Sequence, residues 1–353
     1  MKNRYIIITI LLSSFVISAA ILYFQALPLD EKFQEIKQDL NFPPADYNRI
    51  ISVENKLLAL AIAPDKDNYD KWWYSKVGDQ ELSLLNFPSD PKCGVNTSYD
   101  GFYPRSDGRF DLRKHCLTND QGRLVYLISY DWNTGNMEEI TGPLPSRAGS
   151  GFVTWNQDFS RGIMSMEGYS EQTLYWIWPG GFGPIDLVVA DQARSWNLKD
   201  DYPDYQGGRL GETGNASFPA WSPDGNTIAF FGSVDAIGKI DADRFYAKYS
   251  LYMMDAEKLE PEPVADGFYF PYISKWSPDS QWLAFTANRG SFLKKSGVWL
   301  FSKATHKLLL LSEGNFGYFI WNPDGESLIA IRCNELGDDC SQIEQYDLSD
   351  VLE

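Results

Sequence analysis

A short hairpin motif that recurs along the chain constrains its fold more than any other feature. The stretch 218–230 reads Phe-Pro-Ala-Trp-Ser-Pro-Asp-Gly-Asn-Thr-Ile-Ala-Phe. Pro223 presets the backbone for the first corner of a turn, Asp224 tolerates the second corner, and Gly225 suits the exit. Apolar residues then alternate with small or polar ones, which is the two-residue period of a strand. The stretch therefore predicts a strand closed by Trp221, a tight turn and a second strand.

The motif occurs in three strong copies and three degraded copies. The signature residues of the strong copies are Trp221, Pro223, Asp224, Gly225, Trp276, Pro278, Asp279, Trp321, Pro323, Asp324 and Gly325. The degraded copies lie at Ser52, at Thr118 with one inserted residue, and at Trp155, which keeps the Trp but lacks the Pro. The six turns start at 52, 118, 156, 222, 277 and 322, so the spacings are 66, 38, 66, 55 and 45 residues. Repeats of about 40 to 50 residues with strands in each unit are typical of propellers.

The motif Trp-Ser-Pro-Asp-Gly-x-x-Ile-Ala-Phe resembles the repeat of the TolB-like (WD40-like, PD40) β-propellers. The resemblance covers residues 48–353, and it is strong at Trp221, Trp276 and Trp321 and thin before residue 150. It implies an all-β fold, a six-bladed β-propeller of four-stranded antiparallel blades, often found outside the bacterial cytoplasm. It implies nothing specific about a ligand, because this repeat builds blades and not a site.

The N-terminus predicts a membrane segment. Lys2 and Arg4 precede the twenty uncharged residues 5–24, a length that spans about 30 Å as a helix and matches one hydrocarbon core. Ser18-Ala19-Ala20 would suit signal-peptide cleavage, but the apolar run continues past it. We expect an uncleaved signal-anchor, a transmembrane helix, with a cleaved signal peptide as the alternative. The positive charges before the span place the bulk of the protein on the extracytoplasmic side of a bacterial membrane.

Three regions follow from these features. They are a signal-anchor or signal peptide at 1–27, a spacer at 28–47, and a propeller at 48–353 with insertions at 86–117 and 191–216. The last repeat stops one strand short of a full unit near Glu353. Propellers protect such an edge with a strand from the other terminus. We expect residues within 30–50 to supply that strand and close the ring.

Four cysteines predict two local disulfides. Cys93 and Cys116 would tie down the first insertion, and Cys333 and Cys340 would clamp a hairpin in the last repeat. Four cysteines allow three pairings, and these two pairs are simply the local ones. A zinc site with four Cys ligands is the alternative, but the sequence has no Cys-x-x-Cys knuckle. Disulfides agree with export to an oxidising space.

The charge balance limits the partners. The chain has 48 acidic and 31 basic residues and a net charge of −17. Such a surface repels phosphate backbones, and no basic stripe compensates for it, so we expect no nucleic-acid partner. The expected partner is an unidentified protein or small ligand, and the expected state is a monomer.

The sequence offers no set of catalytic residues. It has two histidines: His115 next to a cysteine, and His306 in a predicted turn. A Ser-His-Asp triad or a histidine-based zinc site would have to use them. The acidic stretch Asp65-Lys66-Asp67-Asn68-Tyr69-Asp70 lacks the Gly and the Glu of a calcium loop. We therefore expect no catalytic residue, cofactor or metal.

The second insertion is the candidate binding loop. It brings together carboxylates and aromatic rings, at Trp196, Asp200, Asp201, Tyr202, Asp204 and Tyr205. Such sets bind sugars or cations, although an exposed acidic loop has the same composition. The favoured hypothesis is a non-enzymatic scaffold that binds a protein or another ligand. The alternative is a carboxylate-dependent glycan hydrolase or lyase that uses these acids.

Overall fold

The computed structural model describes residues 37–53, 56–62, 72–87, 90, 93, 97–105, 107–118, 122–144, 153–167, 172–185, 215–239, 245–290, 296–337 and 339–352. This part of the chain is built from β-strands and contains no α-helix. It accordingly holds no helix long and apolar enough to cross a bilayer. The N-terminal helix expected in 1–27 lies outside the described residues.

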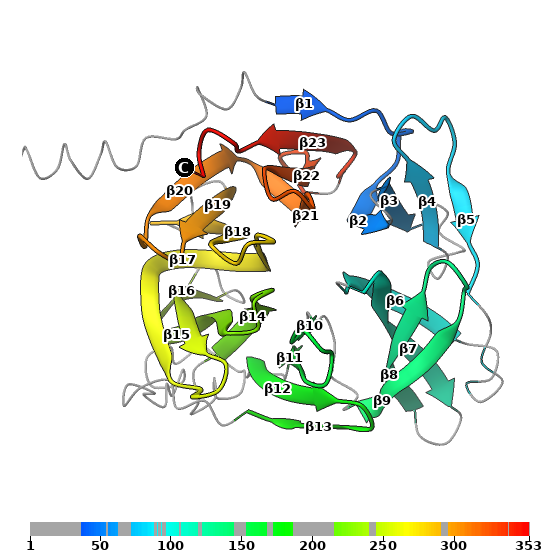
Figure 1. Ribbon diagram of the computed structural model, residues 1–353, viewed down its shortest axis with the longest axis horizontal. Helices are drawn as coiled ribbons and strands as arrows, with labels where there is room; N and C mark the ends of the chain where they lie inside the picture. Colours follow the sequence, from blue (N-terminus) through cyan, green and yellow to red (C-terminus); the bar gives the residue numbers. More distant parts are fainter. Residues whose placement is uncertain are drawn as a thin grey trace, which may run out of the picture.

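The described strands form four four-stranded antiparallel sheets and one seven-stranded sheet, arranged around a common centre (Figure 1). The first sheet contains β2 (Tyr47–Val53), β3 (Lys56–Ile62), β4 (Trp72–Lys76) and β5 (Ser83–Leu85). The second contains β6 (Thr97–Pro104), β7 (Arg109–Thr118), β8 (Gly122–Asp131) and β9 (Met137–Leu144). The third contains β10 (Val153–Trp155), β11 (Gly162–Glu167), β12 (Gln172–Trp178) and β13 (Gly181–Pro184).

The seven-stranded sheet departs from the expected series of separate four-stranded sheets. Its strands are β14 (Asn215–Trp221), β15 (Thr227–Lys239), β16 (Phe245–Asp255), β17 (Pro261–Trp276), β18 (Trp282–Arg289), β19 (Gly297–Ser302) and β20 (Leu308–Glu313). The first part of β17 pairs with β16 and the second part with β18. Phe268 faces Tyr249 on one side and Arg289 on the other, so the ladder is not interrupted between the two halves. In Figure 1, β17 runs from the outer edge toward the centre of the ring.

The last sheet joins the two ends of the described chain. Its strands are β21 (Asn315–Trp321), β22 (Ser327–Cys333), β23 (Gln342–Asp347) and β1 (Lys37–Asp39). β1 lies antiparallel to β23, with Lys37 opposite Tyr346 (Figure 1). Leu40 N donates to Ile343 O over 2.8 Å and continues this contact past the strand. A strand from the range 30–50 therefore covers the edge of β23, which would otherwise expose unpaired backbone groups.

The second sheet corrects one repeat of the sequence analysis. The stretch 86–117, set apart there as an insertion, contains β6 and most of β7. The turn that joins them, Arg105 to Arg109, has Gly108 at φ +81°, as the strong repeat has Gly225 at φ +78°. Thr118 instead ends β7. With a turn start at 105, the first spacings become 53 and 51 residues, close to the later ones.

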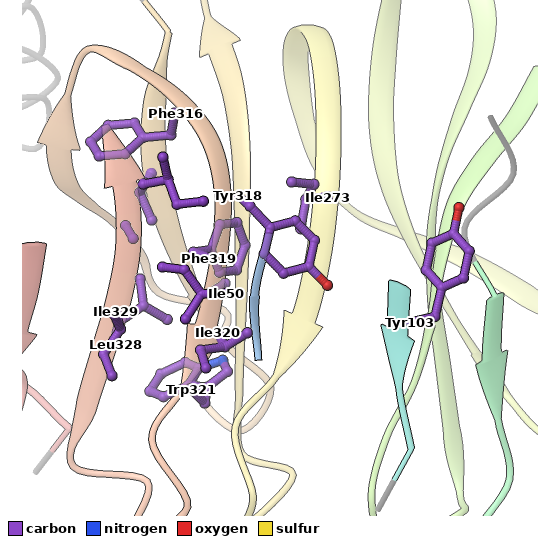
Figure 2. Close-up of a cluster of buried hydrophobic side chains, with 14 of the residues drawn as sticks. Ile50, Tyr103, Ile273, Phe316, Tyr318, Phe319, Ile320, Trp321, Leu328 and Ile329 are labelled. Atoms are coloured by element: carbon purple, nitrogen blue, oxygen red, sulfur yellow. The ribbon is translucent and has the colours of Figure 1, made fainter. Parts of the chain in front are cut away.

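The core fills the spaces between neighbouring sheets. Figure 2 shows one cluster in which Phe319 and Ile320 of β21 meet Ile329 of β22, Ile50 of β2 and Ile273 of β17. Three sheets thus contribute to one cluster. Burial of apolar surface stabilises the folded state by about 25 cal/mol for each Å². These contacts between sheets therefore stabilise the ring.

Candidate ligand site at the ring centre

Backbone irregularities mark the innermost strand of most sheets. Register shifts occur in β2, β6, β14, β17 and β21, the strands nearest the centre in Figure 1. In two of them a non-glycine residue has a positive φ: Phe218 at 52° and Ile273 at 49°. Each lies three residues before a signature Trp. A positive φ is a genuine outlier for a β-branched residue such as Ile. A bulge changes the direction of the side chains near it. These register shifts therefore determine which side chains of the inner strands point toward the centre of the ring.

Five side chains from four inner strands form what we call the axial cluster: Arg49 (β2), Tyr103 (β6), Tyr272 and Lys275 (β17), and Tyr318 (β21). The Arg49 guanidinium carbon lies 4.9 Å from the centroid of the Tyr318 ring, and Lys275 Nζ lies 5.8 Å from it. In Figure 2 the Tyr318 hydroxyl points away from the other apolar side chains of its cluster and toward the side where Tyr103 lies.

Electrostatics connect Tyr103 to the rest of the axial cluster. Burial raises the pKa of the Tyr103 hydroxyl, while the charges of Arg113 and Arg49 act to lower it. Tyr272 also acts on the pKa of Tyr103, so groups from the first, second and seven-stranded sheets influence one phenol. Tyr103, Ile273 and Tyr318 also belong to one buried cluster, so the inner strands bring residues far apart in the sequence close together in space.

A carboxylate beside Tyr103 is already paired. Arg113 Nε donates to Asp100 Oδ1 over 2.7 Å, and His115 Nε2 lies 3.1 Å from the same oxygen. Burial acts to raise the pKa of Asp100, but the hydrogen bond from His115 and the charge of Arg113 hold it below the usual value. His115 therefore serves an ion-pair network on β6 and β7.

The axial cluster offers hydrogen-bond donors. Tyr318 is 0% exposed, and its hydroxyl has no hydrogen-bond partner among the described residues. The same holds for Arg49 Nε. Arg49 Nη1 donates to Asn48 O over 2.7 Å, yet neither Arg49 nor Lys275 has an ion pair in the described part of the chain. Such a set can bind an electron-rich group.

The described ranges contain no group of three His, Cys, Asp or Glu side chains that could hold a metal ion. His306 lies in a turn with φ 56° and packs beside Phe301. An open pocket of about 460 Å³ on β4 and β5 is lined by Tyr74, Lys76, Asp79, Gln80, Glu81 and Ser83. Asp79 Oδ2 accepts from Lys76 N over 2.8 Å there, so this carboxylate stabilises a turn.

One buried carboxyl lies between the second and third sheets. Burial raises the pKa of Asp111 to about 7, against the opposing effects of the Arg105 charge and the Trp155 hydrogen bond. Trp155 Nε1 donates to Asp111 Oδ2, and Arg105 Nη1 lies 3.5 Å from Oδ1. The Arg105 guanidinium also lies 4.0 Å from the Phe159 ring centroid. The carboxyl is fully buried, so it joins two sheets and faces no solvent.

The signature tryptophans occupy the ends of inner strands. Trp155, Trp221, Trp276 and Trp321 end β10, β14, β17 and β21. The indole N–H of Trp276 donates to Ala220 O, and that of Trp321 donates to Lys275 O, each over 3.0 Å. Trp221 differs, because its Nε1 donates to Gly225 O in its own turn. Two of these side chains thus attach one inner strand to the preceding one.

The signature aspartates stabilise turns. Asp224, Asp279 and Asp324 each accept from the backbone N–H two residues later, at Asn226, Gln281 and Glu326. Pro223, Pro278 and Pro323 precede them, and Gly225 and Gly325 follow two of them at φ 78°. Burial acts to raise the pKa of Asp224, but hydrogen bonds from Ser222 and Asn226 and the charge of Lys303 hold it below its usual value.

Both local disulfides are present. Cys93 is bonded to Cys116 in β7, and Cys333 of β22 is bonded to Cys340 just before β23. The second disulfide packs on Gly317, where an added Cβ would lie 3.2 Å from the Cys333 sulfur. Gly317 precedes Tyr318, so this disulfide abuts the strand that carries part of the axial cluster.

The candidate binding loop falls outside the described residues. This applies to Trp196, Asp200, Asp201, Tyr202, Asp204 and Tyr205. The sequence analysis missed the axial cluster, because its members come from strands far apart in the chain. One signal was available: the positions three residues before Trp221, Trp276 and Trp321 are all large and apolar or aromatic.

Solved structures with a similar fold include bacterial propellers. A putative TolB from Agrobacterium tumefaciens is 14% identical over 85% of this chain and 90% of its own, with a TM-score of 0.50. TolB from Acinetobacter baumannii is 11% identical over 78% of this chain, with a TM-score of 0.48, and this chain spans 59% of its length. An oligogalacturonate lyase from Vibrio parahaemolyticus is 13% identical over 88% and 91%, with a TM-score of 0.45. The likeness to the Agrobacterium protein, together with the ring of antiparallel sheets, shows the fold of a TolB-like β-propeller.

The likeness is one of fold. No protein-family model matches the sequence, and a comparison with curated protein sequences finds no match.

Proposed function

We propose that this protein is a non-enzymatic extracytoplasmic β-propeller that binds a protein partner at the centre of its ring. The observation that carries the proposal is the axial cluster, in which four inner strands present donor groups at one place. Tyr272, which is 38% exposed and packs edge-on against Phe218, gives this cluster an aromatic contact surface. Exposed aromatic residues near unpaired donors are typical of binding surfaces.

The ring is proposed to have six blades. The seven-stranded sheet counts as two four-stranded blades that share β17, and the four other sheets count as one blade each. This count agrees with six hairpin repeats when the second repeat starts at residue 105 instead of 118.

The proposed location is the outer side of a bacterial membrane. Two disulfides favour an oxidising space. The uncharged segment 5–24 has the length of a membrane anchor, and the basic residues before it favour this orientation. The proposed oligomeric state is a monomer.

Site-specific photocrosslinking tests the proposal. The full-length chain would carry a benzophenone amino acid in place of Tyr272, or in place of Trp178 on the third sheet as the matched control. Trp178 is 42% exposed, close to the exposure of Tyr272. We expect a discrete crosslinked polypeptide from native membranes at position 272 and not at 178. Equal crosslinking at both positions, or none at 272, would refute a protein-binding ring centre.

The competing function is a glycan hydrolase or lyase that uses the acids of the second insertion, Asp201 and Asp204 among them. Assay of the full-length chain on oligogalacturonate and on other acidic glycans decides between them. Turnover that is lost in Asp201→Asn or Asp204→Asn would establish the enzyme and exclude the scaffold.

A further inference from the structure

Two cations at the ring centre have no counter-ion in the described part of the chain. Arg49 and Lys275 both lie against the Tyr318 ring, at 4.9 and 5.8 Å from its centroid. Their charged groups are therefore within about 10.7 Å of each other. This pairing is unusual in a chain with 48 acidic and 31 basic residues. Since like charges at this distance repel each other, an anion between them would be favoured.

The third donor is the Tyr318 hydroxyl. It is fully buried and has no hydrogen-bond partner among the described residues. A buried hydroxyl without a partner loses its hydration and gains nothing in return. In Figure 2 its oxygen points out of the apolar cluster. Arg49 and Lys275 lie over the same ring and are only half-buried, so a ligand that contacts these two cations lies beside the residue that carries the hydroxyl.

We propose that Arg49, Lys275 and Tyr318 bind a carboxylate of the polypeptide partner, either an acidic side chain or the chain terminus. This inference rests on the proposed function and names the chemical group recognised at its site. Arg presents a planar fork that matches a carboxylate, Lys adds a point charge, and Tyr adds a neutral donor.

The charge balance favours a carboxylate over a phosphate group. The two positive charges of Arg49 and Lys275 exceed the single negative charge of a carboxylate. The chain as a whole, however, carries a net charge of −17. This field opposes a dianion more than a monoanion.

Thermal denaturation of the full-length chain with defined peptides tests the inference. The probes are acetylated triglutamate, triglutamine that is acetylated and C-terminally amidated so that it carries no carboxylate, trigalacturonate and inorganic phosphate, all at the same ionic strength. A ligand that binds only the native state raises the melting temperature in proportion to its saturation. We expect triglutamate to raise the melting temperature by a few degrees, and triglutamine and phosphate to leave it unchanged. A larger shift with trigalacturonate than with triglutamate would refute the polypeptide source.

Variants separate binding from folding. Tyr318→Phe removes only the unpartnered hydroxyl, so the ligand-free protein should melt at the same temperature or higher, while triglutamate affinity falls at least tenfold. Lys275→Gln should lower this affinity to a similar extent. The matched controls are Lys303→Gln, whose lysine lies 3.5 Å from Asp224, and Tyr346→Phe, whose hydroxyl is bonded to Glu344. Both controls should keep the triglutamate affinity.

The outcomes distinguish this inference from the proposed function. Unchanged triglutamate affinity in both Tyr318→Phe and Lys275→Gln would refute the carboxylate site, even if position 272 still crosslinks to a polypeptide. In that case the proposed protein-binding function would be retained, and groups other than Tyr318 and Lys275 would recognise the partner. Carboxylate binding without crosslinking at 272 would support the site and refute the protein partner.

Discussion

At the scale of single residues, Asp111 shows how a polar group is kept inside a sheet interface. Its carboxyl accepts from the Trp155 indole, and the Arg105 charge lies nearby, yet burial outweighs both and raises the pKa to about 7. The folded protein therefore holds a proton on Asp111 at pH values where the unfolded chain has lost it.

This difference predicts a falling stability with pH. An unfolded Asp titrates near 3.9, so between about pH 4 and pH 7 the folded state binds more protons than the unfolded state. The contribution of Asp111 is fully present below about pH 4 and is lost as the pH rises through about 7. Asp111→Asn keeps an acceptor for Trp155 and cannot ionise. We expect urea denaturation to show a decline for the wild type from pH 5 to pH 7 and a flatter profile for the variant.

The control for this experiment is Asp350→Asn, at an exposed position near the C-terminal end. It should reproduce the wild-type profile. Parallel profiles for the wild type and Asp111→Asn would show that Asp111 titrates at its ordinary value.

Residue types alone could not reveal the axial cluster. Arg49, Lys275 and Tyr318 lie in different repeats, and none belongs to the Trp-x-Pro-Asp-Gly signature. Their proximity depends on how the inner strands meet and on the register shifts at those strands. The two disulfides could be predicted from the sequence, because the cysteines of each pair are close in the sequence and one hairpin brings them together.

At the scale of elements, the signature Trp connects neighbouring inner strands. Trp276 ends β17 and donates to Ala220 in β14, a buried contact across 56 positions of sequence. Because the hydrogen bond links two strands that do not pair with each other, it fixes the angle between adjacent units.

Trp276→Phe tests this role. The variant keeps an aromatic ring but leaves the bond to Ala220 unmade, at a cost of about 1–3 kcal/mol in the free energy of unfolding. Trp221→Phe is the matched control, since that indole bonds to the more exposed turn at Gly225 and water can replace it. Chemical denaturation should give a larger loss for Trp276→Phe. An equal loss in both variants would contradict the connecting role.

The hairpin repeat predicted most of the strand pairs but failed in one sheet. The turn from Arg105 to Arg109 has the Asp and Gly of the motif but lacks its Pro and Trp. The sequence analysis therefore did not identify this turn as a repeat and placed the second repeat at Thr118. The sequence analysis also made no prediction of the through-running strand β17, which contains the Asp266-Gly267 pair, a pair typical of turns. Gly267 does have φ 83°, but the strand continues past it with partners on both sides.

At the scale of the whole molecule, the closing sheet joins the two ends of the described chain. Lys37 in β1 forms an ion pair with Glu344, which is 0% exposed and also accepts from Arg332 Nε over 2.9 Å. Cys340 N donates to Asp46 Oδ1 over 3.1 Å, which adds a second contact between the ends. The ring is therefore held by a strand pair and by charges that are distant in sequence.

Two truncations separate the closing strand from what precedes it. A chain that starts at Lys37 keeps β1, and a chain that starts at Asn41 lacks it. The second should melt at a lower temperature and associate more readily, because the edge of β23 is then open to pairing. Calorimetry and size-exclusion chromatography measure these two effects. Identical melting and elution of both chains would show that β1 does not close the ring.

Strand β17 has a consequence for how this architecture can change by duplication or loss of a unit. One half of the strand completes the sheet before it and the other half begins the sheet after it. Excising either unit at the gene level would therefore strip its neighbour of a strand as well. These two units must therefore be inherited together.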